Sequence, residues 1–303
     1  MRAVLSIGTN STRLLIAERS GASWTPVRHL RRGTRLGEGL GPDGELRPQA
    51  VERTLDAAEA FAHVARSAGA EVRVIATSAM RRARDAGAFA QELERRTGLR
   101  LRVIPGQDEA RYSFIGALAG HGHGMGADAP VGVLDAGGGS TELAVGTHRG
   151  LERSRSFEIG AVRLTESTPL REDPPPQAAL AEARRQTVEA LHGIVEVGAG
   201  TERLICVGGT ATTCASMLAR GEREGELVDG ARIVRRELTE LLERIAPMTL
   251  AERRALPGLP AQRADIIVGG LIVLEQVFLA LGIATAIVSI HDLLLGYIVG
   301  GWR

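Results

Sequence analysis

VGVLDAGGGSTELAVG (Val131–Gly146) is the stretch that decides how this chain is interpreted. Two apolar runs flank a glycine-rich turn, and this pattern predicts a β-hairpin. Glycines without a Cβ let backbone N–H groups approach an anion closely, and neighbouring hydroxyls add further donors. The residues that we expect to cradle a phosphate here are Gly137, Gly138, Gly139, Ser140 and Thr141.

Two acids flank the same turn. Asp135 precedes the glycines and Glu142 follows them. Carboxylate oxygens are ligands for hard divalent cations, so this pair predicts a cation site beside the phosphate loop. A tight hairpin that binds no ligand would explain the same residues, and the stretch alone leaves both interpretations open.

The N-terminal stretch AVLSIGTNSTRLLIA (Ala3–Ala17) repeats the central one. The offset is 129 residues (137 − 8), and the repeat predicts two related domains that face each other across a cleft. Ser6 stands where the second copy has Asp135. The first phosphate-binding turn would consist of Gly8, Thr9, Asn10 and Ser11.

Three further segments are candidates for anion binding or catalysis. A buried strand at 204–207 runs directly into Gly208, Gly209 and Thr210, and a helix N-terminus with this composition suits an anion or a nucleotide. Arg81 follows the expected strand 71–76, where a guanidinium group is well placed to receive phosphate. Asp108 and Glu109 open a helix after the strand 101–104; they are either partners of the helix dipole or residues of a catalytic cleft.

The remaining segments predict the surroundings of these loops. We expect a loop over residues 29–46 whose arginines are either solvated or in contact with an anion, and a glycine-rich link over 121–126. The expected helices are 48–68, 86–97, 105–119, 178–195, 237–245, 263–281 and a closing helix from 291, and the last strand is 285–289.

Composition limits the function. The net charge of +1 argues against non-specific binding to nucleic acid or to a membrane surface. The chain has no lysine, which excludes a Walker P-loop lysine and a lysine general base. Cys206 and Cys214 lack metal-ligand spacing and favour a reducing compartment; because no signal peptide is visible, we expect a cytoplasmic protein. A helix followed by a strand explains the apolar stretch 266–287 better than a membrane span.

Nine stretches together resemble the exopolyphosphatase / guanosine pentaphosphate phosphohydrolase (Ppx/GppA) family of the sugar kinase–actin–Hsp70 superfamily. They span nearly the whole chain in the family's order: IGTNSTRLL, RLGEGL, ATSAMR, GQDEARYSFIGA, LDAGGGSTEL, IGAVRLTE, CVGGTATT, RADIIVGGLIVLE and VSIHDLLLG. The resemblance implies an α/β fold with two ribonuclease-H-like domains facing a central cleft. The expected domains are residues 1–124 and 125–290, with the C-terminal helix 291–303 returning to the first. We expect no counterpart of the extra C-terminal helical domain that longer members have.

The resemblance also implies an activity, which is release of the terminal phosphate from inorganic polyphosphate or guanosine pentaphosphate. Glu109 matches the family's water-activating glutamate, Asp135 and Glu142 match the acids that hold Mg²⁺, and the two glycine turns and Arg81 match its phosphate contacts. A kinase of the same superfamily is disfavoured by GQDEARYSFIGA and VSIHDLLLG. Oligomeric state is open, with a homodimer among the options.

One departure from the family concerns the metal site. Family members commonly have aspartate where this chain has Ser6. The sequence therefore leaves a second function open: a binding protein of the same family that binds polyphosphate or guanosine tetraphosphate with little or no turnover.

Overall fold

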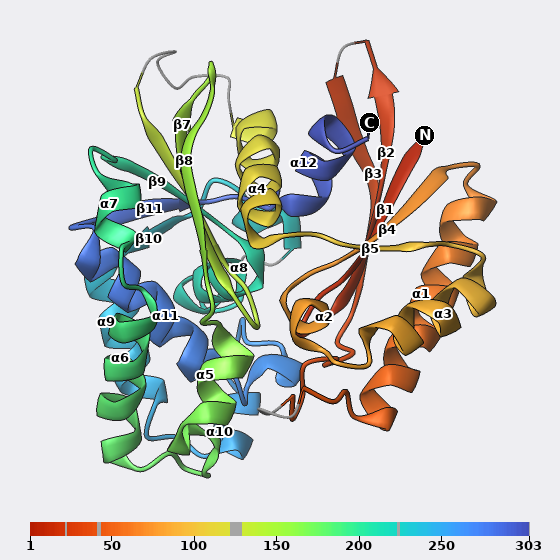
Figure 1. Ribbon diagram of the computed structural model, residues 1–303. Helices are drawn as coiled ribbons and strands as arrows, with labels where there is room; N and C mark the ends of the chain where they lie inside the picture. The colour runs from red at the N-terminus through yellow and green to blue at the C-terminus, as the bar shows by residue number, and fades with distance from the viewer. Residues whose placement is uncertain (22, 41–43, 122–128, 223–224, 303) are drawn as a thin grey trace.

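Two β-sheets form the framework of the computed structural model, which describes residues 1–21, 23–40, 44–121, 129–222 and 225–302 (Figure 1). The first sheet has the strand order β3-β2-β1-β4-β5. Strands β1 to β3 form an antiparallel meander, and β4 and β5 continue in parallel with β1. The bounds are β1 (Arg2–Ile7), β2 (Thr12–Ser20), β3 (Ser23–Arg32), β4 (Glu71–Ala76) and β5 (Leu101–Val103).

The second sheet repeats this topology. Its order is β10-β11-β9-β6-β7-β8, so an antiparallel meander, β6 to β8, is again followed by two parallel strands, β9 and β11. The bounds are β6 (Val131–Ala136), β7 (Thr141–Thr147), β8 (Gly150–Phe157), β9 (Arg203–Val207), β10 (Arg232–Val234) and β11 (Thr285–Val288). The shared strand order is that of ribonuclease-H-like folds, and β10 is an antiparallel addition at the edge.

Helices cover the outer faces of both sheets. On the first sheet, α1 (Pro48–Ser67) and α3 (Ala86–Thr97) bury apolar side chains against β1 and β2. Proline at the start of α1 and the left-handed Gly98 after α3 mark their ends. The core of the second sheet includes side chains from α6 (Gln177–Ala190), α8 (Gly208–Leu218), α9 (Arg235–Ile245) and α11 (Ile267–Ala280). Shorter helices are α2 (Ser78–Arg82), α5 (Ala161–Ser167), α7 (Ile194–Gly198), α10 (Leu250–Arg254) and the 3₁₀ turns Pro169–Arg171, Gly225–Val228 and Ala261–Arg263.

The inner faces of the sheets are covered by two helices in contact with each other. Helix α4 (Gly106–His121) follows the first sheet in sequence but packs its apolar side chains on the second, against β6, β7 and β9. Helix α12 (Leu293–Gly300) follows the second sheet and packs on the first, against β1 and β2. The two helices lie side by side (Figure 1). A Cβ at Gly116 or at Gly296 would clash with the backbone of the opposite helix, so glycine permits this close crossing.

The structure confirms most of the expected elements and corrects three. Residues 29–32, which we expected in a loop, belong to β3, because this long edge strand pairs with β2 as far as Arg32. The helix expected from residue 263 begins only at Ile267, after a 3₁₀ turn. The helix expected over 178–195 is divided into α6 and α7 at Gly193, which has a positive φ. The expected link at 121–126 and the domain boundary at 124 fall mostly on residues outside the described ranges, so that division remains a prediction.

The apolar stretch 266–287 is helix α11 followed by β11, as predicted. Within the described ranges, no helix combines the length and the apolarity needed to cross a membrane.

Candidate active site

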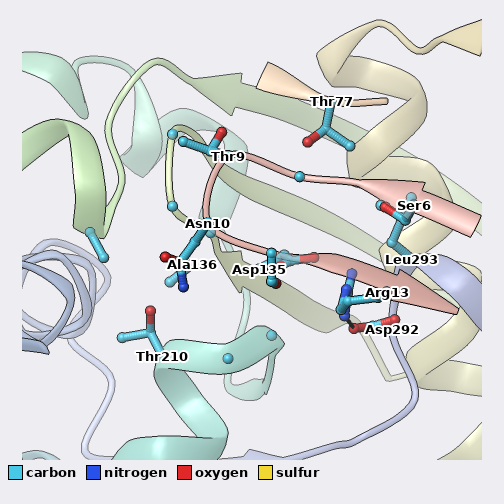
Figure 2. A pocket seen from close by; sticks show the side chains of 18 of the residues that line it. Ser6, Thr9, Asn10, Arg13, Thr77, Asp135, Ala136, Thr210, Asp292 and Leu293 are labelled. Atoms are coloured by element: carbon cyan, nitrogen blue, oxygen red, sulfur yellow. Dashed lines mark hydrogen bonds and ion pairs between the residues drawn. The ribbon is translucent and has the colours of Figure 1, made fainter. Parts of the chain in front are cut away.

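The two hairpin turns and the N-terminus of α8 meet at one polar cleft of about 150 Å³ (Figure 2). The turns are built alike, because the N–H of Gly8 donates to the carbonyl of Ser11 at 3.0 Å and that of Gly137 donates to Ser140 at the same distance. Of the predicted residues, those that line the cleft are Gly8, Thr9, Asn10, Ser11, Glu109, Asp135, Gly137, Gly138, Gly139, Ser140, Gly208, Gly209 and Thr210.

Two glycines allow the three loops to come this close. A Cβ at Gly139 would lie 2.5 Å from the hydroxyl oxygen of Thr9 in the opposite turn. Gly208 has a φ of +84°, and a Cβ there would clash with the carboxylate of Asp135. The α8 N-terminus can therefore approach Asp135 only with glycine at this position.

Glu109 lies in the first turn of α4 and is buried at the cleft. Its Oε2 accepts a hydrogen bond from Nη1 of Arg81 at 2.6 Å, and the same nitrogen also donates to the carbonyl of Ile104. Arg81 contacts the second hairpin through Nη2, 3.4 Å from the hydroxyl of Ser140. Burial raises the pKa of Glu109 to about 7, although Arg81 opposes the shift. A carboxylate with a pKa near neutrality is suited to accept a proton at physiological pH.

Asp135 and Glu142 lie opposite each other on β6 and β7. Burial and the charge of Asp292 raise the pKa of Asp135 to about 6, although the hydroxyl of Ser113 donates to it at 2.8 Å. Burial and the charges of Glu109 and Asp135 raise the pKa of Glu142 well above its usual value. Three mutually repelling buried acids are a favourable place for a cation.

A hydrated cation fits these residues better than a closed metal centre. Among the residues that the structure describes, no group of three or more His, Cys, Asp or Glu side chains is arranged to enclose a metal ion. Mg²⁺ is usually held by one or two carboxylates, and substrate phosphates and water complete its shell. Asp135, which lines the cleft, and Glu142 beside it match this pattern.

Three predicted residues do not line the cleft. Arg81 and Glu142 lie just behind it, where Arg81 is paired with Glu109 and Glu142 accepts a hydrogen bond from Ser156 at 2.7 Å. Thr141 is fully buried, and its hydroxyl donates to the carbonyl of Ile159 at 2.7 Å. The geometry thus gives Thr141 a role in fixing the turn and does not support the predicted contact with phosphate.

The first hairpin contributes a positively charged side chain, Arg13, that the sequence analysis did not single out. Arg13 lies opposite Ser6 in the β1–β2 ladder, which is the relation that Glu142 has to Asp135. The guanidinium group of Arg13 is paired with Asp292, the N-cap of α12 (Figure 2). The 129-residue offset already aligned Arg13 with Glu142 (142 − 129 = 13), so the signal was present in the repeat.

A second missed residue is Arg263, which follows the predicted α8 loop by more than 50 residues in sequence. It lines the cleft, is only 7% exposed, and its Nε has no hydrogen-bond partner among the described residues. Its guanidinium group lies so close to Gly209 that a Cβ there would clash with it. Burial lowers the pKa of Arg263 well below its usual value, and Arg31 and Arg13 lower it further. A polyanion would relieve this repulsion.

The fold and the cleft define a class of protein: a duplicated ribonuclease-H-like protein with paired glycine turns, buried arginines and a buried glutamate of raised pKa at the cleft between them. Comparison with known proteins agrees. The model of the Ppx/GppA phosphatase family matches residues 15–300, and the chain therefore belongs to this family and is an enzyme of the phosphatase class. The resemblance seen in the sequence and the predicted fold class are confirmed.

Individual relatives give the same result. Exopolyphosphatase 2 of Mycobacterium tuberculosis is 35% identical over 97% of this chain and 96% of its own length. The crystal structure of an exopolyphosphatase-like protein has a TM-score of 0.89 and 32% identity, and the match covers 99% of this chain and 98% of the other. Guanosine-5'-triphosphate,3'-diphosphate pyrophosphatase of Aeromonas hydrophila is 29% identical over 93% of this chain and 55% of its own length.

Proposed function

We propose that this protein releases the terminal phosphate from inorganic polyphosphate in a reaction that depends on Mg²⁺, with guanosine pentaphosphate as a second substrate. The observation that carries this proposal is a cleft lined by two glycine-rich turns and a buried glutamate of raised pKa. The names of the relatives supply the substrate class, a chain of phosphoanhydride bonds.

The protein groups divide the reaction between them. The turn amides, the α8 N-terminus and Arg263 bind the oxygens of the terminal phosphoryl group. Glu109 accepts a proton from a water molecule aligned with the scissile bond, and the water oxygen forms the new bond to phosphorus. The bond to the bridging oxygen breaks, and the shortened chain leaves with the electron pair. Arg81 orients Glu109 and favours its ionised form.

Asp135 and Glu142 would hold the Mg²⁺ ion. When bound, the ion would neutralise charge on the transferred phosphoryl group. We place the reaction in the cytoplasm, because both cysteines are free thiols buried in the protein core.

Ser6 favours a second candidate function. The hydroxyl of this buried residue offers no charge to a cation, so the chain would bind polyphosphate or guanosine tetraphosphate and hydrolyse it slowly or not at all.

One assay separates the two functions. Phosphate release is measured from long-chain polyphosphate, tripolyphosphate and guanosine pentaphosphate, each with Mg²⁺ and with EDTA. The proposal expects turnover of polyphosphate that EDTA abolishes. Tight binding of polyphosphate without turnover would support the second candidate and overturn the first.

A further inference from the structure

The phosphate cleft adjoins a second cavity on the side where α12 begins. This rear cavity of about 430 Å³ is lined by residues of β2, β3 and α8 and by the segment that leads into α12. Arg31, Thr212 and Asp292 line both the rear cavity and the cleft, so the two spaces are continuous at these residues. Both sheets and their helices therefore contribute to its walls.

The charges of the rear cavity favour an anion. Asp292 is the one acid among the described residues that line it, and this acid is already paired with Arg13. Arg31, His29 and His291 line the same space. In the described part of the chain, no ion pair or hydrogen bond engages the side chain of Arg31. Arg31 is exposed, yet desolvation and the charge of Arg13 lower its pKa to about 10, so an anion beside it would be stabilised.

Hydroxyl groups add neutral donors to the same cavity. Thr213 and Ser216 of α8 line it, and both are buried. The Oγ of Ser216 is in a residue only 6% exposed and has no hydrogen-bond partner among the residues that the structure describes. A buried hydroxyl without a partner is costly, and an anion with several acceptor oxygens would satisfy it. Inorganic phosphate, with four oxygens, matches one guanidinium group and two hydroxyls.

A larger cavity adjoins the other end of the phosphate cleft. This front cavity of about 1170 Å³ shares Thr9 and Gly139 with the cleft, and five arginines line it against four glutamates. Figure 2 shows Thr9, at the front cavity, and Asp292, at the rear cavity, on opposite sides of Asp135. The front cavity has the room for the rest of a polyphosphate chain whose terminal phosphoryl group lies at the glycine turns.

The proposed reaction separates its two products. In an in-line displacement, the attacking water and the leaving chain lie on opposite sides of the phosphorus atom. A shortened chain that still extends into the front cavity therefore obstructs the released phosphate on that side. The rear cavity, which is smaller and favours an anion, provides a second way out of the cleft.

We propose that the rear cavity binds the inorganic phosphate released by hydrolysis and is the route by which it leaves, while the shortened chain remains in the cleft. This inference rests on the phosphohydrolase function proposed above. It gives Arg31 and Ser216 a role in product release, which is separate from the transfer of the phosphoryl group.

The first test measures the order of release by product inhibition. Initial rates are followed with labelled long-chain polyphosphate at several concentrations of unlabelled inorganic phosphate. Phosphate that leaves first can bind while a chain occupies the cleft, so it should inhibit non-competitively with respect to polyphosphate. Arg31→Gln should raise the inhibition constant about tenfold, as expected for loss of a charged hydrogen-bond donor. The matched control is Arg28→Gln, an exposed arginine of the same strand that is not among the residues lining the cavity, and it should leave the constant unchanged.

The second test measures the route. His29→Trp places an indole ring at the exposed edge of the rear cavity, and Arg28→Trp is its control, because neighbouring residues of a strand point to opposite faces. Rapid quenching measures cleavage in the first turnover, and a fluorescent phosphate sensor measures phosphate release. We expect release to lag behind cleavage in His29→Trp and to keep pace with it in the control and in the wild-type protein.

The outcomes separate this inference from the function on which it rests. Competitive inhibition by phosphate, or an inhibition constant that Arg31→Gln leaves unchanged, would overturn the exit route while hydrolysis by the wild-type protein left the proposed function standing. Release that keeps pace with cleavage in a folded His29→Trp would also overturn it. Absence of turnover in the wild-type protein would overturn the proposed function and the exit route together.

Discussion

The two hairpins that face each other across the cleft share a backbone but carry opposite charges. In β1–β2 the paired positions hold Ser6 and Arg13, whereas in β6–β7 the same positions hold Asp135 and Glu142. Arg13 is neutralised by Asp292, while the two acids of the second hairpin face each other without a basic partner that the structure records. The second hairpin is therefore suited to a cation, whereas the first, with Ser6 and the Arg13–Asp292 pair, is not.

The comparison shows how a duplicated fold can become asymmetric without a change of topology. The turn hydrogen bonds are the same in both halves, and apart from the added edge strand β10 the strand orders are too, so the glycine turn is kept twice. The two sides of the cleft differ in the charged groups that they carry. Glu109 of α4 is paired with Arg81, and Arg13 is paired with Asp292 at the start of α12. In the mechanism proposed above, the proton acceptor Glu109 lies beside the second hairpin, to which Arg81 links it.

Glu109→Gln should lower the activity most, because it removes the proposed proton acceptor beside the acidic second hairpin. We expect kcat to fall by at least about 10²-fold, with the fold and substrate binding retained. The matched control is Asp108→Asn, since Asp108 faces Arg102, 3.9 Å away. Steady-state phosphate release checks both; near-normal kcat in the Glu109 variant would place the base elsewhere, with Asp108 the first suspect.

The second largest effect should be the dependence of kcat/KM and of stability on pH, which reports the buried acids near the second hairpin. Glu109 must be ionised to accept a proton, and its pKa is about 7, so kcat/KM should rise about tenfold per pH unit below pH 7 and level off above it. The folded-state pKa values of Glu109 and Asp135 are raised, so their contribution to stability is greatest below about pH 4 and is lost as the pH rises to about 7. Thermal unfolding without Mg²⁺ checks this sign, and a melting temperature that rises over the same range would contradict it.

Ser6→Asp should have the smallest effect, because it makes the first hairpin more like the second. The new carboxylate would lie opposite Arg13, which is already paired with Asp292 and would be shared between the two acids. We still expect a lower half-saturating Mg²⁺ concentration and a rate increase of a few-fold, with Ser6→Asn as the uncharged control. Indistinguishable Mg²⁺ titrations for the wild-type protein and Ser6→Asp would mean that substrate phosphates already supply the missing ligand.

The sequence predicted those parts of the fold that depend on local pattern. The repeated hairpins and the strand-to-helix turn at Gly208 were visible because glycine spacing and apolar periodicity act over a few residues. The exchange of α4 and α12 between sheets was not, because Gly116 and Gly296 are isolated glycines whose contact depends on tertiary packing.

The same limit applies to the site. The glycine turns, Glu109 and Asp135 could be placed in one cleft from their positions at strand ends. Arg13 could have been placed from the repeat, which aligns it with Glu142. Arg263 could not, because all 37 basic residues are arginines and no local pattern distinguishes a buried guanidinium group from a solvated one. The phosphate contact of Thr141 remains a prediction; its hydroxyl is committed to the carbonyl of Ile159, a tertiary contact that the local sequence does not reveal.

The most direct test of the central claim, that the cation belongs to the second hairpin, is a Mg²⁺ titration of phosphate release from polyphosphate by Asp135→Asn and the wild-type protein. Changes in residues that only support a metal ligand cost 10–100-fold in metal affinity, so loss of a carboxylate ligand should raise the half-saturating Mg²⁺ concentration at least about tenfold. Saturating Mg²⁺ should restore a large part of the activity. A titration curve that coincides with that of the wild-type protein would contradict the account and leave the central hairpin as a phosphate site alone.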